Sequence, residues 1–249
     1  MPSQENFIFG FRAIIEAIKA GKNVDKVIIK KDLSGELFNE FFSIIRQHNI
    51  PYQFVPIEKI NRVTQKNHQG VIALISLIEY QKIENILPMV YEESKIPLVL
   101  VLDHITDVRN FGAIARAAEC AGVHAIIIPE QGAAQINSDA MKTSSGALNF
   151  IPVCRVKSLN DTLNFLSASG LTLVATTEKA TDEYTKADYT TPTAIVFGAE
   201  DIGISNELLN LCGKWVKIPV FGKIESLNVS VVTAVMAYEV VRQRTFTKH

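Results

Sequence analysis

Apolar and polar positions along the chain follow two periods, and these predict a series of strands and helices. Residues 97–103 (PLVLVLD) and 193–200 (TAIVFGAE) are short runs with an apolar centre, typical of strands covered on both faces of a sheet. Residues 159–169 (LNDTLNFLSAS) instead repeat apolar side chains every three or four positions, which indicates a helix with one buried face. The two patterns alternate, so the chain is predicted to be an α/β protein.

Six predicted strands lie in the C-terminal part of the chain, with helical segments between them. This alternation predicts a mostly parallel sheet with right-handed crossovers. Ligands of such sheets bind outside the C-terminal ends of the strands, and each strongly polar loop here follows one of these strands. The six strands are residues 97–103, 124–130, 150–156, 171–177, 193–200 and 215–220.

A smaller α/β unit is predicted at residues 1–80. Helices are expected at 8–20, ended by Gly21, and at 37–47 (LFNEFFSIIRQ). The strands of this unit are expected at 24–30, 51–56 and 71–80.

The domain boundary is expected in the polar stretch 81–96, which contains Pro88 and several glutamates. We therefore predict three parts: a small domain at 1–80, a linker at 81–96 and a larger domain at 97–249.

Composition is that of a soluble globular protein. The 249 residues are 47% hydrophobic and 20% charged, and no apolar run approaches the about 20 residues needed to cross a bilayer. The first residues lack the basic flank and apolar core of a signal peptide. The three cysteines, Cys120, Cys154 and Cys212, are widely spaced and are expected to be reduced, which favours a cytoplasmic protein.

The formal net charge of −1 does not by itself indicate a nucleic-acid partner. Residues 1–31 nevertheless carry six Lys and Arg against three Asp and Glu. This local excess is compatible with a phosphate-binding surface and equally with an ordinary solvated face.

The first of three unusual polar loops is residues 103–122 (DHITDVRNFGAIARAAECAG). Asn110 and Gly112 stand where a helix is expected to begin, near residue 111, and Arg116 follows on the next turn. Free N–H groups at a helix start, together with an arginine, can bind an anion. Asn110 acting as a helix cap and Arg116 lying at the surface is an equally good interpretation.

The second loop, residues 197–205 (FGAEDIGIS), directly follows a predicted buried strand. Gly198 has no β-carbon and permits close approach of a ligand to the backbone. Glu200 is a candidate for binding a donor group on a substrate, or a cap for the next helix. Neither GxGxxG nor GxxxxGK[ST] is present, which disfavours a site for nucleotide phosphates.

The third loop contains Glu225, Ser226, Leu227 and Asn228, before a helix expected to start at Val229. Ser226 and Asn228 are both possible helix caps, but a helix needs only one. No GxSxG motif occurs and no histidine lies nearby, so a serine nucleophile is disfavoured. The five histidines also lack the spacing of metal ligands.

Taken together, NFGAIARAA, FGAEDIGIS and IPVFGKIESLNVSVVTAVMAYEV resemble the three signature motifs of the SpoU branch of the SPOUT RNA methyltransferases. The resemblance covers residues 97–245, and KTSSGA at 142–147 is also similar to the family. FGFRAIIEAI and HQGVIA resemble the ribosomal-protein-like RNA-binding domain that often precedes it. The sequence departs from the family at Val108, Ala199 and Asp201, where proline, asparagine and glycine are usual.

The resemblance implies a deep trefoil knot near the C-terminus that forms a pocket for S-adenosylmethionine. It implies that Thr176, Thr177, Gly198, Ile218 and Leu227 surround this cofactor. It also implies a homodimer with its active site near the interface. The last helix, apolar at Val229, Val232, Val235 and Met236, would then pack against a partner subunit as well as the core, although packing within one subunit also explains these positions.

The implied reaction is methyl transfer from a sulfonium to a ribose 2′-hydroxyl of RNA, without a metal. Arg116 would bind the adjacent phosphate and stabilise the developing alkoxide, because a guanidinium keeps its proton in proteins. Asn110 would fix Arg116 or the ribose, Glu200 would orient the substrate or accept its proton, and Ser226 and Asn228 would complete the pocket.

The pairing of domains is similar to that of bacterial enzymes that methylate a guanosine of 23S ribosomal RNA. Three alternatives stay open: a transfer-RNA 2′-O-methyltransferase, a non-catalytic RNA-binding protein of the same fold, and a generic nucleotide-binding enzyme on a parallel sheet. The third is disfavoured by the missing phosphate motifs.

Overall fold

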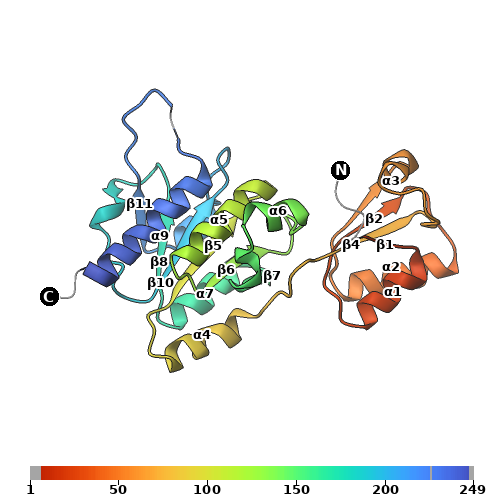
Figure 1. Cartoon of the computed structure of the whole chain (residues 1–249), viewed down its shortest axis with the longest axis horizontal. Coiled ribbons are helices and arrows are strands. Elements are labelled where there is room, and N and C mark those ends of the chain that lie inside the picture. Colours follow the sequence, from red (N-terminus) through yellow and green to blue (C-terminus); the bar gives the residue numbers. More distant parts are fainter. Residues whose placement is uncertain (1–6, 225, 247–249) are drawn as a thin grey trace. The chain divides into compact units, whose positions relative to one another are not determined.

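The computed structural model describes residues 7–224 and 226–246 and divides into two compact units, with the boundary between Glu79 and Tyr80 (Figure 1). Glu225 of the third polar loop and His249 lie outside the described residues. None of the described helices is both long and apolar enough to cross a membrane.

The N-terminal unit is a four-stranded sheet in the order β1-β4-β2-β3. Strand β4 is antiparallel to β1 and β2, and β3 runs parallel to β2 at one edge. Its core lies between the sheet and α1 and α2, where Ile14, Ile45 and Val27 are fully buried. The elements are β1 (Phe7–Phe9), α1 (Phe11–Lys19), β2 (Val24–Lys30), α2 (Glu36–Gln47), β3 (Tyr52–Val55), α3 (Ile57–Val63) and β4 (Val71–Ile75).

The first helix begins later than its apolar pattern predicts. Residues 7–9 form β1, which pairs with β4, and the helix starts only at Phe11. Gly10 separates the two with a φ of 83°, a left-handed conformation that glycine adopts without strain. Both the strand and the helix have one buried face, so their apolar positions together looked like a single helical period in the sequence.

The C-terminal unit is built on a seven-stranded sheet in the order β7-β6-β5-β10-β8-β11-β9, with every pairing parallel. All six predicted strands are present, which confirms the α/β class. The two-residue β9 was missed because its exposed acidic side chains carry no apolar period. The strands are β5 (Leu98–Asp103), β6 (Ala125–Pro129), β7 (Val153–Val156), β8 (Thr172–Thr176), β9 (Asp182–Glu183), β10 (Thr193–Gly198) and β11 (Lys214–Lys217).

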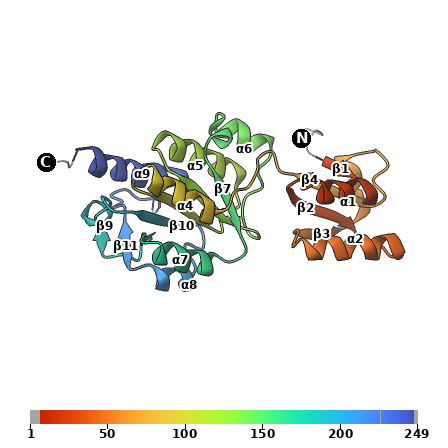
Figure 2. The same ribbon diagram turned by 90° about the horizontal axis from the view of Figure 1, so that it is seen from below.

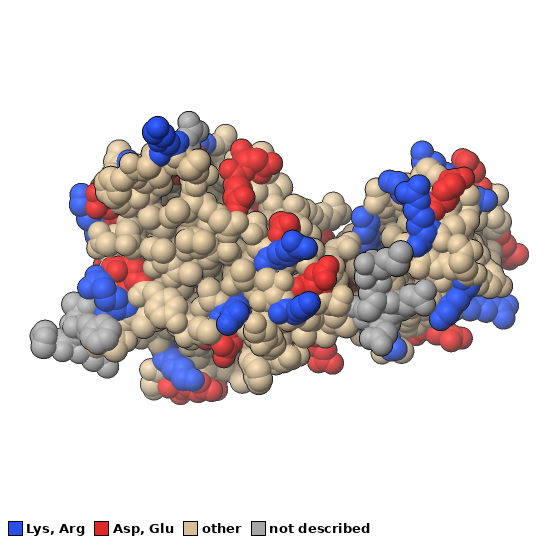
Figure 3. Space-filling model, turned by 45° about the horizontal axis from the view of Figure 1, so that its top comes forward, with Lys and Arg blue, Asp and Glu red and all other residues tan. Residues whose placement is uncertain are grey.

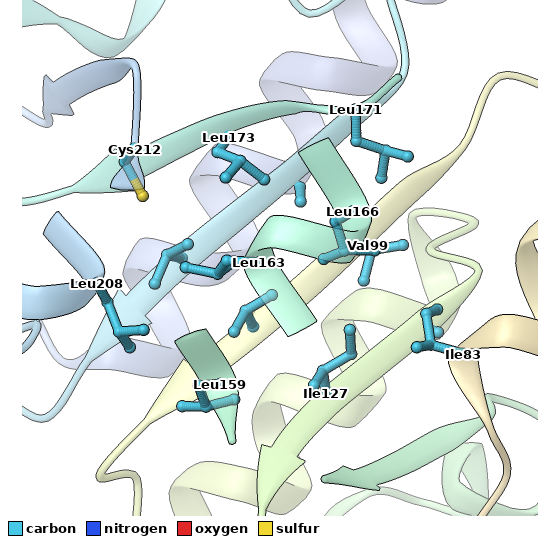
Figure 4. Packing of buried hydrophobic residues seen from close by; sticks show 14 of the residues in the cluster. Ile83, Val99, Ile127, Leu159, Leu163, Leu166, Leu171, Leu173, Leu208 and Cys212 are labelled. Atoms are coloured by element: carbon cyan, nitrogen blue, oxygen red, sulfur yellow. The ribbon is translucent and has the colours of Figure 1, made fainter. Parts of the chain in front are cut away.

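Helices cover both faces of this sheet, as Figures 1 and 2 show. On one face, α4, α7 and α8 enclose an apolar cluster that includes Val99, Ile127, Leu163 and Leu208 (Figure 4). On the other face α5 packs against α9, and α9 contacts β10. The helices are α4 (Ile83–Glu92), α5 (Val108–Cys120), α6 (Ser138–Thr143), α7 (Leu159–Ala168), α8 (Asn206–Leu211) and α9 (Val229–Phe246).

The stretch 81–96, expected to be a linker, mostly forms helix α4 and belongs to the C-terminal core. Ile83, Ile86, Leu87 and Val90 are buried in the apolar cluster with the sheet. Their spacing of three, four and seven residues is that of a helix with one buried face. The glutamates and Pro88 lie on the exposed side, so the polarity of the stretch concealed its apolar face.

Two of the three cysteines are buried, and burial raises the pKa of Cys154 and of Cys212 to about 12. Cys120 is exposed on α5. The thiolate is the reactive form, so we expect one thiol of the native protein to react rapidly with a thiol reagent at pH 8 and three to react in denaturant. Rapid reaction of a Cys120→Ser variant in native buffer would contradict this assignment.

The raised thiol pKa values also make stability depend on pH. Between the ordinary thiol pKa of 9.0 and the raised pKa of about 12, an increase in pH removes these protons from the unfolded chain before it removes them from the folded protein. The free energy of unfolding should therefore fall as pH rises through this range.

Candidate functional site

The parallel strands β5, β8, β10 and β11 end at the same edge of the C-terminal sheet. Gly198 at the end of β10 is paired with Asp103 at the end of β5, and Val216 of β11 is paired with Thr176 at the end of β8. The loops after β8, β10 and β11 surround a cavity of about 510 Å³. This volume is within the usual range for small-molecule sites.

All five residues expected to surround a cofactor line this one cavity: Thr176, Thr177, Gly198, Ile218 and Leu227. They come from three separate loops, and two of the expected catalytic residues, Glu200 and Ser226, line the same cavity.

The cavity wall combines apolar and polar groups. Ile218, Val229 and Val232 offer aliphatic surface, whereas Glu200 and Ser226 offer oxygen atoms. The hydroxyl oxygen of Thr176 is buried and has no hydrogen-bond partner among the described residues. An unpaired buried hydroxyl costs free energy unless a ligand satisfies it, so this atom favours a polar ligand in the cavity.

Glu200 joins three segments that are remote in the sequence. Its Oε1 accepts hydrogen bonds from Asn228 Nδ2 at 2.7 Å, from the Val229 N–H at 3.0 Å and from Asn110 Nδ2 at 3.3 Å. Asn228 Nδ2 also donates to Asn110 Oδ1 at 3.0 Å. The second loop, the start of α5 and the start of α9 therefore meet in a cluster that we call the Glu200 cluster: Asn110, Glu200 and Asn228.

The cap of α5 differs from the expected one, whereas Asn228 caps α9 as expected. Helix α5 begins at Val108 and not near residue 111, because Asp107 Oδ1 accepts the Asn110 N–H at 2.7 Å. Asn110 is thus inside the helix and its side chain is free to reach Glu200. At α9, Asn228 Oδ1 accepts from the Ser230 N–H at 2.9 Å, and Glu200 caps the Val229 N–H. A carboxylate at a helix N-terminus is favourable. The helix that Glu200 caps is α9, and not α8, the next helix in the chain.

Arg116 is not brought to the Glu200 cluster or to the cavity. It lies exposed on α5, six residues after Asn110, which corresponds to about 9 Å of rise and about 240° of rotation. Asn110 and Asn228 do not line the cavity either, although they hold Glu200, which does.

The second loop folds back on itself, and Gly198 makes this possible. A β-carbon at Gly198 would lie 2.1 Å from the backbone carbon of Gly203 and 2.2 Å from the nitrogen of Ile204. The Gly203 N–H donates to Ala199 O at 2.8 Å across the fold. The close neighbour that excludes a side chain at Gly198 is therefore the protein's own backbone, whereas the sequence suggested a ligand.

Asp201 does not strain this loop, although glycine is usual at its position. Its φ is not positive, and the left-handed residue of the loop is Gly203, with a φ of 68°. Asp103 holds the far end of the loop: its buried carboxylate accepts the Ser205 N–H at 2.8 Å and contacts His104 Nδ1 at 2.7 Å.

Several residues of the site were not predicted. Glu178 and Lys179 after β8, and Lys217 and Val220 at the end of β11, line the cavity. The rule that ligands bind at the C-terminal strand ends would have found Glu178, Lys179 and Val220, because they follow or end predicted strands, whereas Lys217 was expected in the middle of the strand 215–220. Asp103 could have been found in the same way.

We expect Gly198→Ala to destabilise the C-terminal unit by about 3 kcal/mol or more, because the added methyl group would overlap a backbone that cannot move independently. Urea unfolding would measure the loss. Gly213→Ala is a matched control, since nothing lies within 4 Å of the position that its methyl group would take and its φ is not positive. Equal stability of the two variants would contradict this account of the loop.

The class of protein is defined by comparison with known families. Residues 97–238 match the SpoU rRNA Methylase family, and residues 7–81 match the RNA 2′-O ribose methyltransferase substrate-binding family. The chain belongs to the SpoU methylase family. The fold expectation of an RNA-methyltransferase domain preceded by a substrate-binding domain is thereby confirmed.

Two of the relatives extend over nearly the whole chain, and a third matches 60% of it. Bacillus subtilis YacO, whose name assigns it to the TrmH family of tRNA/rRNA methyltransferases, is 31% identical over 98% of both chains. The SpoU methyltransferase AviRb from Streptomyces viridochromogenes, crystallised with AdoMet, is 26% identical with a TM-score of 0.60, covering 96% of this chain and 90% of AviRb. The A. aeolicus TrmH/SpoU tRNA modifying enzyme is 30% identical with a TM-score of 0.55, covering 60% of this chain and 76% of that one.

Proposed function

We propose that this protein transfers a methyl group from S-adenosylmethionine to a ribose 2′-hydroxyl of RNA. The observation that carries the proposal is the cavity at the strand ends, with Glu200 in its wall and tied to Asn110 and Asn228. Family membership and the cofactor bound to AviRb support the same reaction.

The cavity suits the proposed cofactor. Ile218, Leu227 and the backbone at Gly198 would hold its apolar parts, and the unpaired hydroxyl of Thr176 would gain a hydrogen-bond partner. No phosphate site is needed, in agreement with the missing phosphate motifs. When bound, S-adenosylmethionine supplies an electrophilic methyl group on a positively charged sulfur, a charge that Glu200 and Glu178 in the wall would favour.

Glu200 is proposed to receive the proton of the target hydroxyl. All three hydrogen bonds to its carboxylate go to Oε1, and Oε2 has no partner among the described residues. The three donors fix the carboxylate, because rotating it would break bonds to both α5 and α9. A carboxylate that is held still and has one free oxygen is suited to accept a proton.

The remaining residues are assigned to the RNA. Ser226 in the cavity wall would donate to the ribose. In the proposed homodimer, Arg116 of the second copy would bind the phosphate next to this ribose and stabilise charge on the attacking oxygen. Arg116 is separate from the cavity of its own chain, so we assign it no part in holding the cofactor.

A homodimer is part of this proposal. Helix α9 buries Val229 and Met236 in its own unit but leaves Val231 47% and Tyr238 52% exposed. A second copy would cover these side chains. We also propose a deep trefoil knot in this unit. Such a knot would bring together the loops after β8, β10 and β11, which surround the cavity.

The RNA is proposed to be 23S ribosomal RNA, methylated at a guanosine in the cytoplasm. The N-terminal domain, residues 1–80, would bind this RNA, and the methyltransferase domain would begin with α4 and not at residue 97. Transfer RNA is the second candidate, favoured by the likeness to the A. aeolicus tRNA enzyme.

Incubation of the purified protein with labelled methyl donor and separated ribosomal or transfer RNA tests the proposal. Nuclease digestion and mass spectrometry should identify 2′-O-methylguanosine in the ribosomal fraction. Label found only in transfer RNA would identify transfer RNA, and not ribosomal RNA, as the substrate. Cofactor binding without transfer to either RNA would favour a non-catalytic RNA-binding protein.

A further inference from the structure

The edge strand β3 of the N-terminal unit presents aromatic side chains to solvent. Tyr52 and Phe54 are 43% and 42% exposed. They are two residues apart on a strand and therefore lie on the same face of the sheet. Their ring centroids are 5.7 Å apart with an interplanar angle of 79°.

Helix α2 extends this surface with a third ring and a cation. The Phe42 ring centroid lies 5.0 Å from that of Tyr52 and 6.1 Å from that of Phe54. The guanidinium of Arg46, one turn further along α2, lies 6.0 Å from the Phe42 centroid. We call Phe42, Arg46, Tyr52 and Phe54 the β3 aromatic surface.

Tyr52 and Phe54 are not part of the buried core of the N-terminal unit. Neither Tyr52 nor Phe54 belongs to the buried clusters of the unit, although Phe42 packs against one of them. Strand β3 ends the sheet, so its outer edge pairs with no other strand among the described residues. Neighbouring exposed rings on an unpaired edge are a liability unless a partner uses them.

Charge favours a polyanion as that partner. Residues 1–79 carry ten Lys and Arg against eight Asp and Glu, whereas residues 80–249 carry 15 against 18. Lys and Arg side chains are interspersed with Asp and Glu side chains on the visible face of the N-terminal unit, on the right in Figure 3. Lys26 Nζ donates to Gln53 Oε1 at 2.8 Å, but Gln53 points to the opposite face of β3, so Arg46 is the cation beside the rings.

We propose that the β3 aromatic surface stacks on unpaired bases of the RNA substrate, while Arg46 binds a neighbouring phosphate. The proposal rests on the proposed function, since it assigns a binding surface for the same RNA. Exposed rings beside a cation can hold single-stranded RNA, because every base has a face that can stack on a ring. The substrate class is therefore RNA with an unpaired segment.

The test uses the full-length protein and a Tyr52→Leu/Phe54→Leu double variant. Leucine keeps apolar volume against α2 but removes the ring faces. The probe is a single-stranded RNA of about 12 nucleotides with an internal 2-aminopurine. Wild-type protein should quench the probe, and the variant should bind it about 10- to 100-fold more weakly with the quenching lost. The salt dependence of binding should not change, because no phosphate contact is removed.

Two controls separate stacking from other effects. Phe150→Leu removes a ring that is 77% exposed in the C-terminal unit and should change nothing. Arg46→Gln should instead reduce the salt slope by up to about one charge, in keeping with a phosphate contact. Unchanged affinity and quenching in the leucine variant would overturn the proposal.

A second copy of this chain is the competing occupant. If the leucine variant sediments as a smaller species than the wild-type protein and RNA binding is unaltered, the surface is a protein interface and the proposal fails. Failure of the proposed function is distinguishable: wild-type protein would then transfer no methyl group to any RNA, whatever the probe experiment shows.

Discussion

Glu200→Gln should lower the rate of methyl transfer by about 10²- to 10⁴-fold, the usual contribution of general acid–base catalysis. Glutamine retains an acceptor oxygen for Asn228 and for the Val229 N–H, so the links to α9 survive. It replaces Oε2, the carboxylate oxygen without a partner among the described residues, by an NH₂ group that cannot accept a proton. The variant therefore removes the chemistry while leaving the geometry nearly intact.

The measurement combines single-turnover transfer from labelled donor with calorimetric cofactor affinity and thermal unfolding. Affinity and unfolding temperature should stay close to those of the wild-type protein. Glu119→Gln, an exposed carboxylate on α5, is the matched control and should transfer at the wild-type rate. Full activity of Glu200→Gln would refute the role of Glu200 as proton acceptor. Lost cofactor binding would reassign it to holding the cofactor.

Arg116→Ala should reduce methyl transfer to background, a loss of at least about 10²- to 10³-fold. The reason is geometric: Arg116 is exposed on α5 and outside the cavity, so its removal acts on the RNA and not on the cofactor. Cofactor affinity should stay within a few-fold of the wild-type value.

Arg109→Ala is the control for this variant, because Arg109 is also an exposed arginine on α5. It removes the same charge near the same helix and should retain most of the activity. Arg116→Lys keeps the charge but loses the planar, two-pronged donor set, and should recover only part of the rate. Retained turnover in Arg116→Ala would refute the assignment.

The elements of the fold were largely predictable from the sequence because they depend on local spacing. The six strands of the C-terminal sheet stand out as apolar runs, and α7 stands out by its helical period. The errors have local causes as well. Polar residues hid the apolar face of α4, and half-buried β1 merged with α1 across Gly10.

The residues of the cavity were predictable only as members of separate loops and by resemblance to a family. Thr176 ends β8, Gly198 ends β10, and Ile218 and Leu227 lie in the loop after β11, and nothing in their local sequence requires them to meet. Parallel pairing of β5, β10, β8 and β11 brings their C-terminal ends to one edge, and the loops must then converge there.

The sequence alone thus determined the element types, the residues available for chemistry and the family. Only the tertiary structure decided which side chains touch: that Glu200 caps α9 and holds Asn110, that the backbone at Gly203 occupies the space beside Gly198, and that Arg116 is apart from the cavity. The physical reason is the range of the interactions. Helical and strand periods arise between residues a few positions apart, whereas these contacts join positions up to 118 residues apart and depend on strand order and register.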